Sequence, residues 1–365
     1  MLLWSVLHLT GTRAANADYE RLGAPSVTLD DIRHFRQLDS KALGHPKYHW
    51  VSGVETTTGP PGQGIATSVG MAIARKWLAS HYNKPSFDVF DYDIYTVCGD
   101  GCLMEGVGSE AASLVGHLGL DDLCWIYDNN HIKIEGNTRI AFTEDVATRF
   151  LAYGWNVLSV GDTNEVVEAY RYVLQLRHQP AVIALSRRPL PTFDRRKYAS
   201  AAGVARGGYV MADAPGGPPE IILMGSGSEV SLIVEAHEAL AVQGIRFRVV
   251  SMPSWDIFEH QPQSYRESAL PAEISTRIAV EQGSALGWDR YVGATGLVIG
   301  METLGASAPF KELQRKLGSS PSGSSISRGR CWEASNDARE RRGCGCGRRR
   351  DGGAALRHGD LRRRR

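Results

Sequence analysis

Residues 94–101 read IYTVCGDG, an apolar run that ends in a glycine-flanked aspartate. An apolar run of this length predicts a buried strand, and the glycines predict its end. Residues 108–119 then predict a helix, for which Ser109 is the expected N-cap. The next apolar run, Leu123–Tyr127, predicts a second strand that ends at Asp128-Asn129-Asn130. Strand, helix and strand in this order predict two parallel strands of an α/β sheet.

Two polar side chains follow these strands at what we expect to be one edge of the sheet. Carboxyl ends of parallel strands meet there, and open α/β sheets bind ligands at that edge. Asp100 and Asn130 would therefore offer two oxygen atoms to one cation, and Mg²⁺ takes such ligands together with phosphates. Gly-Asp-Gly alone is also a common turn tripeptide, so the paired asparagines one strand later decide for the metal interpretation. The two words together resemble the signature of thiamine diphosphate enzymes.

A glycine-rich stretch narrows the family. Residues 53–64 read GVETTTGPPGQG and precede an apolar helical run at 65–77. Glycines at a helix entrance let the backbone approach a phosphate or a flat ring, although a plain Gly/Pro loop would look alike. The words VETTTGPPGQG, GDGCLMEG, YDNNHIKIEG, ARGGYV and FRVVSMPSWDIFE follow in this order. The chain thereby resembles transketolase over most of residues 1–318, in two separated blocks. A deoxyxylulose phosphate synthase, a related thiamine enzyme, fits these words less well.

The resemblance implies a metal and cofactor site. In the family, the positions of Asp100, Asn130 and the backbone carbonyl of Ile132 hold Mg²⁺, or Ca²⁺ or Mn²⁺ in its place. The cofactor is thiamine diphosphate, with Asn130 and Gly101 beside its diphosphate and Gly59-Pro60-Pro61 along its aminopyrimidine. The family usually has leucine where Pro61 stands. Because proline lacks an N–H and fixes φ, that contact is expected to differ here.

Three further residues take roles from the resemblance. His45 matches a histidine that faces the substrate, and Glu105 matches an acid in a glutamate network across the dimer interface. Arg187 matches an arginine that clamps the sugar phosphate, a task that suits a guanidinium fork. Each also has a simpler interpretation. His45 could be a solvated loop residue, Glu105 an acid favoured by a helix start, and Arg187, next to Arg188, part of a basic turn.

The activity that the resemblance implies is transfer of a two-carbon ketol unit from a ketose phosphate to an aldose phosphate, as in the pentose phosphate pathway. The thiamine cofactor acts as the electron sink, and the protein supplies placement and charge. The implied partners are sugar phosphate substrates and a second copy of the chain, since the family forms homodimers whose active sites use both subunits.

The resemblance has gaps as well as matches. The chain opens inside the family's first domain, and near Val160 it passes directly to words that resemble the end of the middle domain. Because the skipped part carries the glutamate that protonates the aminopyrimidine, we expect impaired catalysis. The alternative is a non-catalytic transketolase-derived remnant that at most binds metal and diphosphate.

We therefore expect four parts, with an α/β fold in the folded ones. They are an incomplete thiamine diphosphate-binding domain with a parallel sheet (1–160), a remnant of the middle, pyrimidine-binding domain (161–195), a smaller α/β C-terminal domain (196–318) and a disordered tail (319–365).

The predicted tail differs in composition from the rest of the chain. It holds thirteen arginines, no lysine and five acidic residues, with much Gly and Ser. Such a composition does not bury enough surface to fold. Clustered arginines would suit a nucleic-acid-binding arm, but Trp332 is the only aromatic residue for base stacking. A GC-rich stretch read in the wrong frame is the preferred interpretation, and we expect no specific nucleic-acid partner.

Cysteine usage and hydropathy favour a reducing, aqueous compartment. Cys98, Cys102 and Cys124 fall in or beside predicted core strands, where buried thiols are common. The apolar run 2–9 has no positive charge close before it, so it predicts a core helix rather than a signal peptide. No run reaches the roughly 20 apolar residues that a membrane span needs. We expect a cytoplasmic protein with no membrane partner.

Overall fold

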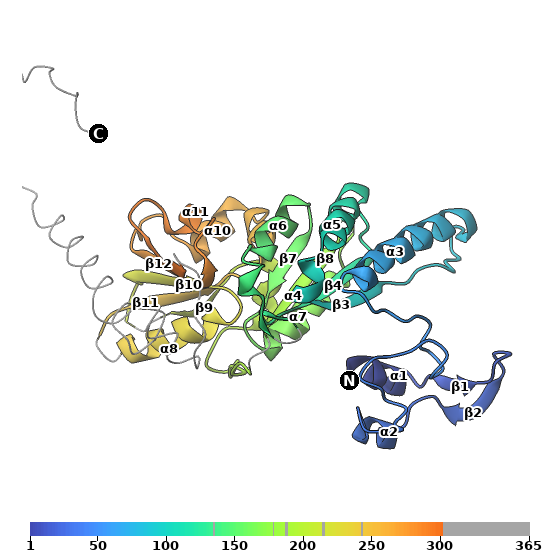
Figure 1. Ribbon diagram of the computed structural model, residues 1–365. Helices are drawn as coiled ribbons and strands as arrows, with labels where there is room; N and C mark the ends of the chain where they lie inside the picture. Colours follow the sequence, from blue (N-terminus) through green and yellow to red (C-terminus); the bar gives the residue numbers. More distant parts are fainter. Residues whose placement is uncertain (134–135, 178, 187–188, 214–215, 242–243, 302–365) are drawn as a thin grey trace, which may run out of the picture.

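The computed structural model describes residues 1–133, 136–177, 179–186, 189–213, 216–241 and 244–301 (Figure 1). Three parts follow one another along the chain: an N-terminal module, a four-stranded sheet and a five-stranded sheet. The predicted tail, residues 319–365, and the end of the predicted C-terminal domain lie outside the described residues.

The N-terminal module packs around its own small core. Its elements are α1 (Leu2–Leu9), β1 (Arg13–Ala15), β2 (Arg21–Pro25) and α2 (Leu29–Arg33), with β1 and β2 antiparallel. The helix expected at residues 2–9 is confirmed, and it buries Trp4 and Leu7. The core of the module consists of buried residues that all come from this part of the chain: Trp4, Leu7, Val27, Ala42, Val51 and Val54. Figure 1 shows the module (dark blue) set apart from the sheets.

The first sheet is parallel throughout and has the strand order β3-β4-β8-β7. Its strands are β3 (Ile94–Gly99), β4 (Leu123–Asn129), β7 (Asn156–Ser159) and β8 (Ala181–Ser186). The elements around it are α3 (Gln63–Tyr82), α4 (Asp100–Leu103), α5 (Gly106–Leu118), α6 (Val146–Ala152), α7 (Thr163–Val173), the hairpin β5 (Ile132–Lys133) and β6 (Gly136–Asn137), and the 3-10 turn η1 (Thr138–Ile140). Both strands predicted from the apolar runs are confirmed, and so is the parallel α/β architecture. The expected burial of the first strand was wrong, because β3 is the edge strand of this sheet and exposes Tyr95 and Val97.

Two layers of helices cover the first sheet. On one face, side chains of α3, α5 and α6 surround the aromatic group Trp125, Phe150 and Trp155, whose ring centroids lie 4.8 to 5.7 Å apart. On the other face, α7 packs over β7 and β8. The predicted start of α5 was wrong. The helix begins at Gly106 with Glu105 at the N-cap, and Ser109 lies inside it, where its hydroxyl accepts a hydrogen bond from Arg149.

The second sheet is mixed and has the order β13-β12-β10-β11-β9. Its strands are β9 (Tyr209–Asp213), β10 (Ile221–Gly225), β11 (Phe247–Ser251), β12 (Arg277–Ser284) and β13 (Leu297–Met301), and only β9 runs antiparallel. The accompanying helices are α8 (Glu229–Ala241), α9 (Trp255–Glu259), α10 (Gln263–Ala269), α11 (Asp289–Val292) and the 3-10 segment η2 (Ala201–Arg206). The second, smaller α/β domain expected from the sequence is confirmed.

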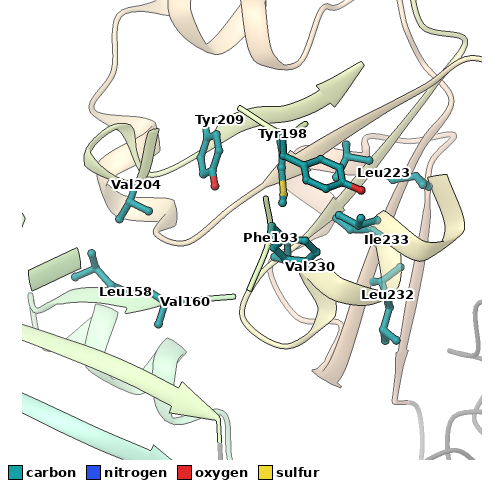
Figure 2. Packing of buried hydrophobic residues seen from close by; sticks show 14 of the residues in the cluster. Leu158, Val160, Phe193, Tyr198, Val204, Tyr209, Leu223, Val230, Leu232 and Ile233 are labelled. Atoms are coloured by element: carbon teal, nitrogen blue, oxygen red, sulfur yellow. The ribbon is translucent and has the colours of Figure 1, made fainter. Parts of the chain in front are cut away.

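One hydrophobic cluster joins the two sheets (Figure 2). Leu158 and Val160, at the end of β7, belong to the same cluster as Leu223 and Val230 of the second sheet and its helix α8. The backbone continues this contact, because the Ser159 N–H donates to the carbonyl of Pro253 at 2.7 Å. Val160, near which the sequence passes from words that resemble the family's first domain to words that resemble its middle domain, therefore lies inside a continuous core.

Residues 161–195 complete the first sheet and touch the second. Their helix α7 lies between the sheets, and their strand β8 pairs with β4 on one side and β7 on the other. The origin of this segment as a remnant of a middle domain stays a prediction. Within the described ranges, no helix combines the length and the apolar character that crossing a bilayer requires.

Candidate functional site

The candidate site begins with a buried carboxylate at the end of β3. Asp100 is the first residue of α4 and is fully buried. Its Oδ1 accepts a hydrogen bond from the Tyr127 hydroxyl at 2.7 Å. Its Oδ2 accepts two backbone N–H groups, from Asn130 at 3.1 Å and from His131 at 2.7 Å. The structure thus joins the ends of β3 and β4 through this one carboxylate, as the strand order predicted.

The backbone after β4 is shaped to reach Asp100. His131 has a φ of 56°, in the left-handed region that non-glycine residues seldom adopt. This turn directs two successive N–H groups at one carboxylate oxygen. The Asn130 side chain is also held, since its Nδ2 donates to Asp128 at 2.6 Å and its Oδ1 accepts from the Ile132 N–H at 2.8 Å. The loop is therefore ordered by its own polar groups.

Burial sets the protonation of the neighbouring groups. It raises the pKa of Tyr127 strongly, and the Asp100 carboxylate adds to the rise. Tyr127 is consequently a neutral donor that fixes one carboxylate oxygen in place. Burial likewise raises the pKa of the Cys98 thiol. Cys98 and Cys124 are buried free thiols within the sheet, as the sequence predicted.

The oxygen atoms at this edge suit a hard cation. A carboxylate at Asp100, an amide oxygen at Asn130 and a carbonyl at Ile132 are the kinds of ligand that Mg²⁺ and Ca²⁺ take. Asp100 Oδ1 accepts the Tyr127 hydroxyl, and the His131 Nδ1 lies 4.0 Å from the same oxygen. No group of three or more His, Cys, Asp or Glu side chains poised for a metal occurs in the described part of the chain. The donor set fits Mg²⁺, and the roles of the three residues stay predictions.

The glycine-rich loop packs against the start of α5. Gly62, at the N-cap of α3, has a φ of 83°, and a Cβ there would lie 2.8 Å from Val107 Cγ1 and 3.1 Å from Glu105 Cβ. Only glycine meets both conditions without strain. Gly59, Pro60 and Pro61 are exposed on this loop. The structure therefore brings the predicted aminopyrimidine loop beside Glu105, which follows the end of the short helix α4 that Asp100 begins.

A lysine that the sequence analysis did not single out lies between these parts. A Cβ at Gly101 would meet the Cγ of Lys133 at 3.3 Å, so the lysine stem covers this glycine. The Lys133 ammonium then pairs with Glu105 Oε1 at 3.1 Å. Its place in the sequence, directly after Ile132, was the available signal. The Glu105 side chain is about 39% exposed. Its carboxylate contacts Lys133 of the β5–β6 hairpin, and the residue is the N-cap of α5.

Two predicted residues do not join this cluster. His45 is exposed and lies in the N-terminal module, which has its own core, whereas Asp100 stands on the first sheet. Arg187 lies outside the described residues. The described site therefore comprises the metal-type ligands, the glycine loop, Glu105 and Lys133.

Family models match both halves of the chain. The model described as "Transketolase, thiamine diphosphate binding domain" matches residues 1–187. The model described as "Transketolase-like TK C-terminal domain" matches residues 207–320. The first match includes the whole first sheet and every described residue of the candidate site.

Curated relatives agree with these matches. A transketolase of Geobacillus stearothermophilus is 25% identical over 595 aligned positions, which cover 87% of each chain. The alignment is longer than the 365 residues of this chain, so part of that relative has no counterpart here. A transketolase of Nostoc sp. is 49% identical over 175 residues, covering 48% of this chain and 24% of its own length.

A solved transketolase from Leishmania mexicana covers 87% of this chain and 86% of its own, at 21% identity and a TM-score of 0.45. The family assignment rests on the sequence matches, of which the first alone spans half of the chain. The chain belongs to the transketolase family of transferases, and its first domain is of the type that binds thiamine diphosphate.

Proposed function

We propose that this chain binds thiamine diphosphate with Mg²⁺ at the carboxyl edge of β3 and β4 and carries out transketolase-type ketol transfer between sugar phosphates, at an impaired rate. The observation that supports the proposal is the meeting of Asp100 and the Asn130 loop at the carboxyl ends of β3 and β4, where the Asp100 carboxylate lies 3.1 Å from the Asn130 backbone N–H.

The residues divide the work of holding the cofactor. Asp100, Asn130 and the Ile132 carbonyl would hold the cation, and the diphosphate would lie beside Gly101, whose missing side chain leaves room for the Lys133 stem. The loop from Gly59 to Gly62 would line the ring. When bound, thiamine diphosphate supplies the electron sink for breaking a carbon–carbon bond beside a ketose carbonyl. Tyr127, whose pKa burial raises, keeps its proton and donates a hydrogen bond to Asp100 Oδ1, which holds the carboxylate in place.

Two observations support the impaired rate. The alignment with the Geobacillus relative leaves a long part of that protein without a counterpart in this chain. The predicted substrate-facing residue, His45, is exposed in the separate N-terminal module. They also favour a second candidate function, a non-catalytic remnant that only binds the metal and the diphosphate.

The decisive experiment measures binding and turnover on the same preparation. Tryptophan fluorescence or calorimetry follows thiamine diphosphate binding with and without Mg²⁺, and a coupled assay follows ketol transfer from a ketose phosphate to an aldose phosphate. Metal-dependent binding with slow turnover is the expected result. Binding without turnover assigns the chain to the second candidate, and no binding at millimolar cofactor overturns both.

The proposal extends to assembly and location. We infer a homodimer in the cytoplasm, with sugar phosphates as substrates and without a specific nucleic-acid or membrane partner. Exposed apolar side chains on one helix, α5, support self-association: Val107, Leu114 and Leu118 are 42 to 45% exposed. Sedimentation velocity at several concentrations tests it, and a monomer at tens of micromolar would contradict the dimer.

A further inference from the structure

We infer that Lys133 is the protein's cation for the terminal phosphate of the diphosphate. The inference rests on the proposed function and adds one residue to it. Its starting point is a contact: the aliphatic stem of Lys133 lies over Gly101, with Cγ, Cδ and Cε 3.3, 3.5 and 3.7 Å from the place of a Cβ. The ammonium therefore ends beside the glycine at which the diphosphate is expected.

The present partner of the lysine is easily exchanged. Lys133 and Glu105 are 34% and 39% exposed, and one contact of 3.1 Å joins them. A single ion pair with this much solvent access contributes little to stability. A diphosphate offers the ammonium several anionic oxygens and can take the place of the carboxylate at little cost.

The charge at this edge calls for such a cation. Asp100, Glu105 and Asp128 place three carboxylates around the loop after β4, and Asp100 is fully buried. A diphosphate would be repelled by these groups unless cations lie between them. The proposed Mg²⁺ supplies part of that charge, and Lys133, whose stem lies over Gly101, supplies a further positive charge.

The lysine is also held in place by its element. Residues Ile132 and Lys133 form β5, which pairs with β6 in a short antiparallel hairpin. Ile132 is the predicted carbonyl ligand of the cation, so the metal ligand and the phosphate ligand would be consecutive residues of one strand. Successive residues of a strand point to opposite faces. In this strand the backbone carbonyl of Ile132 would bind the cation, and the side chain of Lys133 would bind the phosphate.

The test uses Lys133→Met, which keeps the stem over Gly101 and removes the charge. Lys76→Met is the matched control. Lys76 lies on α3 and pairs with Asp121 at 2.6 Å, in an ion pair separate from the Lys133–Glu105 contact. Dissociation constants are measured for thiamine diphosphate, thiamine and inorganic pyrophosphate at saturating Mg²⁺. We expect Lys133→Met to raise the dissociation constants of thiamine diphosphate and pyrophosphate roughly ten-fold, which corresponds to the loss of one charged hydrogen bond. The dissociation constant of thiamine should not change. Lys76→Met should bind all three as the wild type does.

The outcomes separate this inference from the proposed function. Wild-type binding of thiamine diphosphate that Lys133→Met leaves intact overturns the role of the lysine alone, and so does an equal loss for thiamine, which would show a merely structural part. Pyrophosphate binding that depends on Lys133, without any affinity for thiamine diphosphate, supports the lysine and overturns the cofactor assignment. A wild type that binds neither ligand overturns both. Glu105→Gln, which releases the ammonium, should tighten pyrophosphate binding.

Discussion

Two buried carboxylates in this chain accept similar sets of hydrogen bonds but lie in different places. Asp100 follows β3 at the edge of the first sheet, and Glu165 lies where the two sheets meet. Asp100 accepts hydrogen bonds from the Tyr127 hydroxyl and two backbone N–H groups. Glu165, on α7, accepts them from the Tyr209 hydroxyl, the Ser251 hydroxyl and the Gly161 N–H, each at 2.7 Å. Asp100 is 0% exposed and Glu165 is 1% exposed. Burial and hydrogen-bond count therefore do not tell a ligand site from a structural one.

The difference lies in where the donors come from. Both backbone donors of Asp100, Asn130 and His131, belong to one loop, in which His131 and the following Ile132 are exposed. The donors of Glu165 come from two strands of the second sheet and from the junction before α7. Loop donors can move apart to admit a cation, whereas strand donors hold two sheets together. We therefore expect Asp100 to govern binding and Glu165 to govern stability.

The largest expected effect is on stability at the contact between the sheets. Glu165→Ala leaves two hydroxyls and one N–H buried without their acceptor, and it opens a cavity. Each unsatisfied group costs about 1–3 kcal/mol, so the free energy of unfolding should fall by about 4 kcal/mol. Urea denaturation followed by tryptophan fluorescence measures this change.

The control for that variant is Glu168→Ala on the same helix. Glu168 pairs with Arg171, whose side chain is 67% exposed, and its removal should change the free energy of unfolding by less than about 0.5 kcal/mol. Equal and small effects of the two variants would contradict the structural role of Glu165.

The second effect is expected at the other carboxylate. Asp100→Ala should lower the free energy of unfolding by only about 2 kcal/mol, because water can reach the freed N–H groups of the loop. It should, however, abolish the stabilisation by cofactor, which is about 2.7 kcal/mol for the wild type at one hundred times its dissociation constant. Thermal unfolding with and without thiamine diphosphate and Mg²⁺ measures both. A variant that retains the cofactor-dependent shift in Tm would refute the metal site.

The third effect concerns the glycine loop beside the site. Gly62→Ala places a Cβ 2.8 Å from Val107 at a φ of 83° and should cost about 1–2 kcal/mol of unfolding free energy. Gly59→Ala is the matched control, since a Cβ at Gly59 meets nothing within 4 Å. It should stay within about 0.5 kcal/mol of the wild type. Equal losses at the two positions would mean that the contact with α5 does not form.

The two carboxylates also differ in how well the sequence predicted them. Asp100 and Asn130 could be placed together because each follows an apolar run, and the ends of neighbouring parallel strands meet at one edge. Glu165 could not be recognised, since its partners Tyr209 and Ser251 are 44 and 86 residues away in the chain. Contacts over such distances depend on how the two sheets dock, which local patterns do not encode.

The same limit explains the other misses. The helix expected from residue 108 begins at Gly106, because the Gly62 loop packs on its first turn and Glu105 takes the N-cap. Lys133 escaped notice because its partner Glu105 lies 28 residues earlier. Within the first sheet, strand positions followed from apolar runs alone. For β4 the reason is burial on both faces, which leaves a continuous apolar signal, whereas β3 carries an apolar run although Tyr95 and Val97 are exposed. Side-chain pairing across elements left no such signal.

The smallest expected effect is a change in the pH dependence of stability, and it concerns Glu165. Burial is the main cause that raises the pKa of Glu165, and Asp162 adds to it, while the hydrogen bonds from Gly161, Ser251 and Tyr209 oppose the rise. The folded state therefore holds the Glu165 proton at pH values where the unfolded chain has released it. This contribution to stability is present in full below the unfolded pKa and is lost as the pH rises through the folded one.

Glu165→Gln removes that titration and keeps one oxygen for the two hydroxyls. At the acid end of the pH range, protonated Glu165 and glutamine are both uncharged. Charge should therefore contribute least there to the difference in unfolding free energy between the two proteins. As the pH rises from 4 to 8, the glutamine variant should gain stability relative to the wild type, because only the wild type has to bury a carboxylate. The ion pair of Arg195 with Asp162, at 2.7 Å, is common to both proteins and should cancel. Urea denaturation at each pH measures the difference, and a difference that stays constant would show that burial does not raise the pKa of Glu165.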